Sequence, residues 1–155
     1  MTEIQRCTLP HALASRDIIA SSLTGSGKTL CYLIPVIETL YRNKWSVYDG
    51  LGALIILPTR ELALQVFEVY NSTCGGHEFS VGLVIGGKKL EYEQKEINNM
   101  CILICTPGRI LQHLHETPGF EASNVLITVL DEADMMLELG FENTLNAIFD
   151  ELPKN

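Results

Sequence analysis

Five short apolar runs, separated by longer amphipathic stretches, constrain the fold of this chain more than any other feature. The runs are rich in Ile, Val and Leu with little alternation, which is typical of strands covered on both faces. They lie at 17–21, 53–57, 80–85, 101–106 and 125–130. The stretches between them predict helices over 3–15, 28–42, 60–72, 89–99, 107–115 and 141–152, with Pro35 expected to kink or shorten the second. Alternating strands and helices predict an α/β fold, a parallel sheet with helices on both faces.

Length and composition indicate one folded domain that covers residues 1–155. The chain is 46% hydrophobic, and none of its apolar runs approaches the roughly 18 residues of a membrane-spanning helix. Its start lacks the pattern of a signal peptide, so we expect a soluble intracellular protein without membrane contact. The five cysteines are odd in number and lack C-x-x-C spacing, which favours buried, reduced thiols over a metal site.

The formal charge of −8 argues against a broad surface for polyanions. Nonspecific affinity for nucleic acid comes mainly from Lys and Arg. If this chain binds a polyanion, it must use few cations and many backbone amides.

The segment SLTGSGKT, residues 22–29, is typical of a phosphate-binding loop. The usual pattern G-x-x-x-x-G-K-[ST] has glycine where this chain has Ser22, another small residue. Gly25 and Gly27 permit a nest of inward N–H groups, and the helix that follows adds partial positive charge. Lys28 can reach terminal phosphates, and Thr29 offers a hydroxyl to Mg²⁺. The nucleotide-binding residues that we predict in this loop are Thr24, Gly25, Ser26, Gly27, Lys28 and Thr29.

Three carboxylates follow the last apolar run: Asp131, Glu132 and Asp134. Acids at a strand's carboxyl end suit metal-assisted phosphoryl transfer when a phosphate loop is present. We assign Asp131 to Mg²⁺, largely through water, and Glu132 to the attacking water. On this interpretation the catalytic residues are Lys28, Asp131 and Glu132.

Five motifs occur in order: TGSGKT (24–29), PTREL (58–62), GG (86–87), TPGR (106–109) and DEAD (131–134). The set resembles the DEAD-box family of ATP-dependent RNA helicases, over essentially the whole chain. The resemblance implies the first of two RecA-like, P-loop NTPase domains, with ATP and Mg as cofactors.

The resemblance also implies roles for individual residues. Gln5, in TEIQ (2–5), would read adenine, and a Gln amide can pair with adenine N6 and N7 together. Asp134 would pair with the second domain, and Met135 replaces an arginine common after the acidic motif. Backbone contacts would hold single-stranded RNA without reading its sequence. The implied RNA-binding residues are Pro58, Thr59, Arg60, Gly86, Gly87, Thr106, Pro107, Gly108 and Arg109, with a possible addition from Lys88.

Smaller segments, among them ETLYR (38–42) and GRILQH (108–113), resemble a nucleolar subfamily. That subfamily acts in small-subunit ribosomal RNA maturation and in release of small nucleolar RNAs, which implies a nuclear, nucleolar location and pre-ribosomal partners. The family's Ser-Ala-Thr motif and C-terminal RecA-like domain are not in the chain. Because arginines of that second domain accelerate phosphoryl transfer, we expect the isolated chain to hydrolyse ATP negligibly and to unwind nothing.

Two other functions stay open from the residues alone. The chain could be a scaffold that binds nucleotide without hydrolysis, although intact Lys28, Asp131 and Glu132 argue against decay. It could also be another P-loop enzyme, such as a small-molecule kinase or a DNA translocase. The PTREL and TPGR loops disfavour that alternative.

Overall fold

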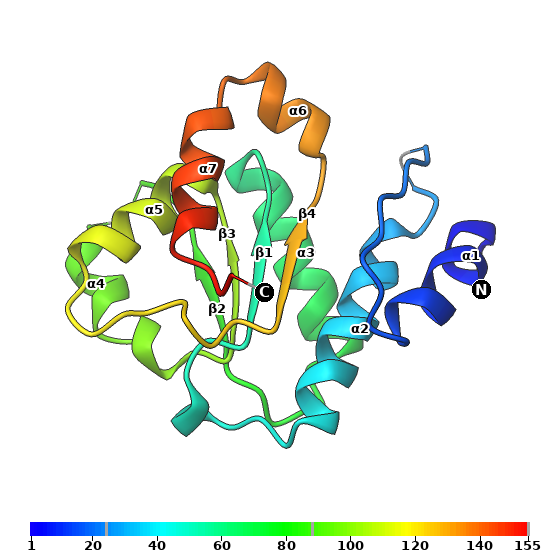
Figure 1. The fold of residues 1–155 in the computed structure, drawn as a ribbon, viewed down its shortest axis with the longest axis horizontal. Coiled ribbons are helices and arrows are strands. Elements are labelled where there is room, and N and C mark those ends of the chain that lie inside the picture. The colour runs from blue at the N-terminus through cyan, green and yellow to red at the C-terminus, as the bar shows by residue number, and fades with distance from the viewer. Residues whose placement is uncertain (24, 88, 155) are drawn as a thin grey trace. The chain divides into compact units, whose positions relative to one another are not determined.

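A computed structural model describes residues 1–23, 25–87 and 89–154 of the chain. Two compact parts form, Met1–Lys44 and Trp45–Asn155, and each is described by itself. Figure 1 shows the elements of both. The predicted roles of Thr24 and Lys88 concern residues outside the described ranges.

The first part is a pair of packed helices, α1 (Glu3–Ala12) and α2 (Lys28–Arg42). Thr2 caps α1, because its side chain accepts from the backbone N–H of Gln5. We expected Pro35 to kink or shorten α2. The helix is not shortened, because it continues to Arg42 with Pro35 buried inside it. The irregular segment between the helices contains the glycine loop.

The prediction of a strand at 17–21 is wrong, because this segment has no strand conformation. Ile18 and Ile19 are exposed rather than buried in it. A strand exists only through hydrogen bonds to a neighbouring strand, and the described residues of the first part form two helices and irregular segments, with no strand among them. An apolar run signals a tendency to be buried and cannot supply that neighbour.

The second part is built on a parallel four-stranded sheet, as the sequence predicts. Its strands are β1 (Ala53–Ile56), β2 (Val81–Val84), β3 (Ile102–Cys105) and β4 (Ile127–Leu130), in the order β2-β3-β1-β4. The register pairs Ile56 with Cys105 and with Leu130, which are the last residues of β1, β3 and β4, so these three strands end at the same height in the sheet. The carboxyl ends of all four therefore form one edge.

Helices connect the strands and cover the sheet. They are η1 (Val47–Asp49), α3 (Arg60–Thr73), α4 (Leu90–Gln94), η2 (Ile97–Asn99), α5 (Pro107–Glu116), α6 (Ala133–Glu138) and α7 (Glu142–Asp150). Predicted helix 89–99 is thus split into α4 and η2, while α6 was not predicted as a helix. Parallel strands need crossover connections: α3 joins β1 to β2, α4 and η2 join β2 to β3, and α5 joins β3 to β4.

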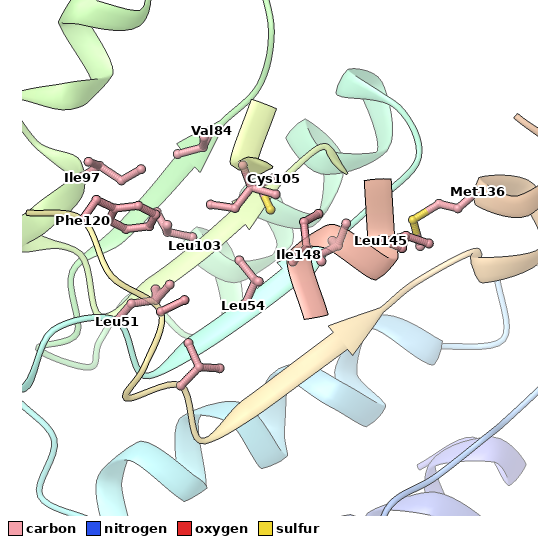
Figure 2. Close-up of a cluster of buried hydrophobic side chains, with 14 residues drawn as sticks. Leu51, Leu54, Val84, Ile97, Leu103, Cys105, Phe120, Met136, Leu145 and Ile148 are labelled. Atoms are coloured by element: carbon pink, nitrogen blue, oxygen red, sulfur yellow. The ribbon is translucent and has the colours of Figure 1, made fainter. Parts of the chain in front are cut away.

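Successive side chains of each central strand point to opposite faces of the sheet. Leu54 and Leu103 belong to the cluster under α5 and α7, which pack together (Figure 1). Figure 2 shows this cluster between the sheet and the helices. Its buried members are Leu51, Leu54, Ile56, Val84, Ile97, Leu103, Cys105, Ile110, Phe120, Ala122, Val125, Met136, Leu145 and Ile148.

All five cysteines are free thiols, as predicted. The expectation that they are buried holds for Cys74, Cys101 and Cys105, and burial raises the pKa of the Cys105 thiol. It is wrong for Cys7, which is exposed on α1, and Cys31 is half-buried. Cys7 lies on a helix with a single packed face, so an apolar residue there can face water. Within the described ranges no helix has both the length and the apolar character needed to cross a membrane.

Candidate functional site

The glycine loop is closed by contacts within the first part of the chain. Gly25 and Gly27 have φ angles of 78° and 90°, the left-handed region that favours glycine. Lys28 Nζ donates to the carbonyl of Ser22 at 3.1 Å, and the hydroxyls of Ser22 and Ser26 lie 2.6 Å apart. Ser22 therefore does more than provide a small residue. Its carbonyl and hydroxyl both hold the loop in shape.

The helix that follows this loop begins without a side-chain cap. Its N-cap is Gly27, and α2 starts at Lys28, with Thr29 in the first turn. The first N–H groups of an α-helix have no partner within the helix, and its dipole favours anions there. The start of α2 thus has the local chemistry of a phosphate site.

Gln5 is tied to the glycine loop. Its Nε2 donates to the carbonyl of Gly27 at 3.2 Å, and its Oε1 accepts from the N–H of Thr2 at 2.9 Å. A Cβ on Gly27 would lie 2.6 Å from this Nε2, so the contact requires glycine. The predicted adenine reader thus also anchors the loop. The T-x-x-Q capping box signals the local contact between Thr2 and Gln5, whereas the bond to Gly27, 22 residues away, has no signal in the sequence.

The sheet brings four of the motifs to one edge. GG follows β2, TPGR follows β3, the segment PTR follows β1, and the acidic motif follows β4. The strand order arranges them as GG, TPGR, PTR and acids, with neighbouring strands roughly 4.8 Å apart. Ligands of parallel α/β sheets bind outside this edge. The three segments with predicted RNA contacts are consecutive, and the acids lie beside the last of them.

The acidic motif makes an abrupt turn from strand to helix. Asp131 donates its N–H to the carbonyl of Ile56, continuing the β1–β4 pairing by one residue. Glu132 then adopts φ 53° and ψ 49°, a left-handed conformation rare outside glycine, and caps α6. Its N–H donates to Asp131 Oδ1 at 3.0 Å. Such strain clusters at functional sites, and the two carboxylates at this turn, Asp131 and Glu132, are both half-buried.

The third carboxylate of the motif lies at the surface. Asp134 is exposed in the first turn of α6, and its Oδ1 accepts from the N–H of Met135 at 2.9 Å. Met135 is also partly exposed. An exposed acid can contact another domain.

The glycine pair accommodates Arg60. Cβ atoms on Gly86 and Gly87 would lie 3.0 and 2.8 Å from its guanidinium nitrogens, and Gly87 also has φ 106°. The sequence suggested that these glycines let a ligand's backbone approach. They also make room for the arginine of PTREL. Thr59, just before it, caps α3 by accepting from the N–H of Leu62 at 3.3 Å.

The TPGR segment forms the start of α5. Thr106 is the N-cap and makes no side-chain cap bond, and Pro107 occupies the first helical position, where its missing N–H costs nothing. Gly108 is exposed and a Cβ there would meet open space. Gly108 is thus the exposed position of this turn, while Pro107 is buried and Thr106 is half-buried.

Arg109 differs from the rest of its motif because its side chain is only 9% exposed. Its Nε donates to Glu93 Oε2 at 2.6 Å, and one Nη donates to Gln112 Oε1 at 3.0 Å. Glu93 also meets the buried His113, whose Nε2 lies 2.8 Å from the same oxygen. Sequence reasoning missed Glu93 and His113. None of the five motifs includes them. Glu93 lies 16 residues before Arg109 and 20 residues before His113, so their contacts leave no local pattern in the sequence.

The comparisons with known proteins agree with this arrangement. The family described as DEAD/DEAH box helicase matches residues 2–155. The chain is 53% identical over 154 residues to ATP-dependent RNA helicase DBP4 of Coccidioides immitis, covering 99% of this chain and 19% of that protein. It is 54% identical to probable ATP-dependent RNA helicase DDX10 of Homo sapiens, covering 99% of this chain and 18% of that protein. It thus spans about a fifth of the length of these curated relatives.

Solved structures are similar as well. The yeast DEAD-box splicing factor Prp28 matches with a TM-score of 0.87 and 34% identity, over 97% of this chain and 36% of that one. A DEAD box protein from the hyperthermophile Methanococcus jannaschii matches with a TM-score of 0.88 and 36% identity, over 97% and 40%. The motifs at the sheet edge, the family match and these structures agree, and the chain belongs to the DEAD/DEAH box helicase family.

Proposed function

We propose that this chain is the ATP-binding half of an ATP-dependent RNA helicase, an RNA-dependent ATPase. The observation that supports it most is the sheet edge, where GG, TPGR, PTR and the acidic motif follow four adjacent strand ends. A glycine loop that opens a helix completes the set in the first part of the chain. The relatives that match at 53–55% identity are themselves named ATP-dependent RNA helicases.

The nucleotide would be held mainly by backbone. N–H groups of the loop and the start of α2 would receive phosphates, and Lys28 would exchange its bond to Ser22 for one to a phosphate oxygen. The adenine would be read by Gln5. The nucleotide-binding set is Gln5, Thr24, Gly25, Ser26, Gly27, Lys28 and Thr29.

Mg²⁺ fits the donors that the chain offers. The described residues contain no group of three or more His, Cys, Asp or Glu side chains that could hold a metal alone. Mg²⁺ normally takes one or two protein oxygens and completes its shell with phosphates and water. Thr29 and Asp131 would hold it, and it would neutralise charge on the phosphates. Glu132 would orient the attacking water and accept its proton.

Single-stranded RNA would cross the carboxyl ends of β2, β3 and β1. Its backbone would meet the glycine pair, the TPGR turn and PTR in that order, through N–H groups, threonine hydroxyls and arginines. Contacts of this kind position a strand without reading bases, and contacts to the 2′-OH distinguish RNA from DNA. The RNA-binding set is Pro58, Thr59, Arg60, Gly86, Gly87, Thr106, Pro107, Gly108 and Arg109.

In the full-length protein, ATP and RNA would draw this half and a C-terminal RecA-like domain together, with Asp134 at their interface. Both ligands would favour the closed state, which drives the cycle, and local strand separation would follow. The similarity to the DBP4 and DDX10 proteins supports a nucleolar role in small-subunit ribosomal RNA processing, on pre-ribosomal particles.

Replacing Glu132 by Gln in the full-length protein tests the catalytic assignment. Gln keeps the shape and the left-handed backbone of Glu132 but cannot accept the proton, so RNA-stimulated phosphate release should fall about 100-fold or more. Glu138→Gln, at an exposed position of α6, is the matched control and should leave the rate unchanged. An unaltered rate in Glu132→Gln would refute hydrolysis by this site. Equal stimulation by RNA and DNA of one length would instead favour another P-loop activity.

A further inference from the structure

We propose that Glu93 and His113 are positioning residues that hold Arg109, and through it the TPGR turn, in the geometry that binds RNA. The inference rests on the proposed RNA-binding function. It concerns side chains outside the motifs, on α4 and in the middle of α5.

The contacts form one continuous chain. Arg109 Nε donates to Glu93 Oε2 at 2.6 Å, and His113 Nε2 lies 2.8 Å from that oxygen. His113 Nδ1 lies 2.8 Å from the hydroxyl of Thr117, the C-cap of α5. The network therefore begins in the first turn of α5, passes through α4, and returns to the end of α5.

Hydrogen-bonding capacity defines the histidine tautomer. A carboxylate can only accept, so the neutral histidine tautomer that fits these contacts carries its proton on Nε2 and donates it to Glu93. Nδ1 is then an acceptor, and Thr117 can donate to it. Both ring nitrogens of His113 have a partner in this arrangement, as a buried polar side chain requires.

Because the network is buried, its side chains are held more firmly than those of an exposed ion pair. The side chains of Arg109 and Glu93 are 9% and 11% exposed, and His113 is fully buried. Solvent screens such charges poorly, and removing one partner leaves the other uncompensated. Arg109 therefore has little freedom of its own, and Glu93 holds its Nε while Gln112 accepts from one Nη.

The location of Glu93 links two of the predicted RNA-binding loops. α4 begins at Leu90, shortly after Gly87, while Arg109 belongs to the turn that follows β3. A bond between Glu93 and Arg109 thus holds the segment after GG against the start of α5. The pairing of β2 with β3 brings the two loops together, and this ion pair adds a side-chain link between α4 and α5 beyond the strand ends.

Simple electrostatics gives the opposite expectation, which makes the proposal testable. If Glu93 only added negative charge near the RNA, its removal would strengthen binding of a polyanion. If Glu93 holds Arg109 in place, its removal weakens binding although the protein becomes less negative. The direction of the change separates the two.

The experiment measures RNA-stimulated ATPase activity of the full-length protein as a function of oligouridine concentration. Glu93→Ala should raise the KM for RNA at least about tenfold with kcat at saturating RNA retained, and Glu93→Gln, which keeps one acceptor, should raise it less. Glu91→Ala removes the same charge from an exposed position of α4 and should leave the KM equal or lower. His113→Gln should raise the KM in the same direction as Glu93→Gln.

A double-mutant cycle then tests whether Glu93 acts through Arg109. The double variant Glu93→Ala/Arg109→Ala should have the same KM for RNA as Arg109→Ala alone. Once Arg109 is removed, loss of Glu93 has no arginine left to disorder. Full additivity would overturn the proposal, as would an unchanged or lower KM in Glu93→Ala. A merely structural role would instead weaken ADP binding together with RNA binding, so ADP affinity is measured for each variant. If the alanine variant does not fold, Glu93→Gln and His113→Gln decide.

Failure of this inference is distinct from failure of the proposed function. If the wild-type protein shows no RNA stimulation, the proposed function fails and this inference fails with it. If the wild type is stimulated and the Glu93 variants match it, only the positioning role is lost.

Discussion

Two arginines at the sheet edge, Arg60 and Arg109, lie in contrasting surroundings. Arg60 is exposed and lies against the bare backbone of two glycines. Arg109 is almost buried and bonded to a carboxylate. The same residue type therefore offers an exposed cation in one loop and a nearly buried, bonded one in the next. The sequence shows both arginines equally, and the surroundings decide what each contributes.

Tyr70, on α3, carries a buried hydroxyl for which the described residues provide no hydrogen-bond partner. Burial, with smaller contributions from Cys74 and Cys101, raises the pKa of Tyr70 to about 12. An unfolded tyrosine ionises near pH 10, so the folded state keeps a proton that the unfolded state loses above that pH. Stability from this group is complete below about pH 10 and is lost as pH rises toward 12.

We therefore expect Tyr70→Phe to be neutral or stabilising at pH 7, by up to about 2 kcal/mol, because it removes an unpaired buried polar group. It should also lessen the fall in stability between pH 10 and 12. Urea unfolding at both pH values measures these effects, with the exposed Tyr92→Phe as control. A clear loss of stability at pH 7 would show that the hydroxyl has a partner after all.

At the level of elements, the sequence predicts best where burial has a clear period. The four strands of the sheet and most helices were expected near their observed bounds. The errors have physical causes. The run 17–21 has apolar residues but no partner strand in its part of the chain, and α6 follows a left-handed Glu132 that no propensity foretells.

The helix α7 is attached to the sheet chiefly by Leu145 and Ile148, both buried in the cluster of Figure 2. Ile148→Ala should lower the free energy of unfolding by about 2–5 kcal/mol, and Ile148→Val by about 1 kcal/mol, because each leaves a cavity in proportion to the atoms removed. Asn146→Ala, at an exposed position of the same helix, should change it by less than about 0.5 kcal/mol. Fluorescence of Trp45, the single tryptophan, reports unfolding of this part. Equal effects at the two positions would contradict the observed packing.

At the level of the whole molecule, a net charge of −8 limits how RNA can be held. The proposed contacts rely on backbone N–H groups and hydroxyls, with two arginines in the set. Neutral donors release no counterions when they bind phosphate, so most of this affinity should be insensitive to salt.

We expect a shallow salt dependence for binding of single-stranded RNA by the chain. With about two to three cationic contacts, log Kobs should fall against log salt with a slope of about −1.5 to −2. Anisotropy of a labelled oligouridine, titrated at several KCl concentrations, measures this slope, and Arg60→Ala should reduce its magnitude by about 0.7. A slope steeper than about −5 would require an extended basic surface that the proposed contacts do not include.

The sequence by itself determined the α/β class, the parallel sheet and the location of four of the five motifs at a strand's end, while the strand expected before the glycine loop does not form. These follow from local periodicity and from glycine loops, which act within a few residues. Only the tertiary structure decided that GG, TPGR and PTR are neighbours, since the order β2-β3-β1-β4 is not the order of the chain. It alone also joined Glu93 and His113 to Arg109, and Gln5 to Gly27. Periodicity specifies which face of an element is buried, whereas the partner that buries it depends on how distant segments come together.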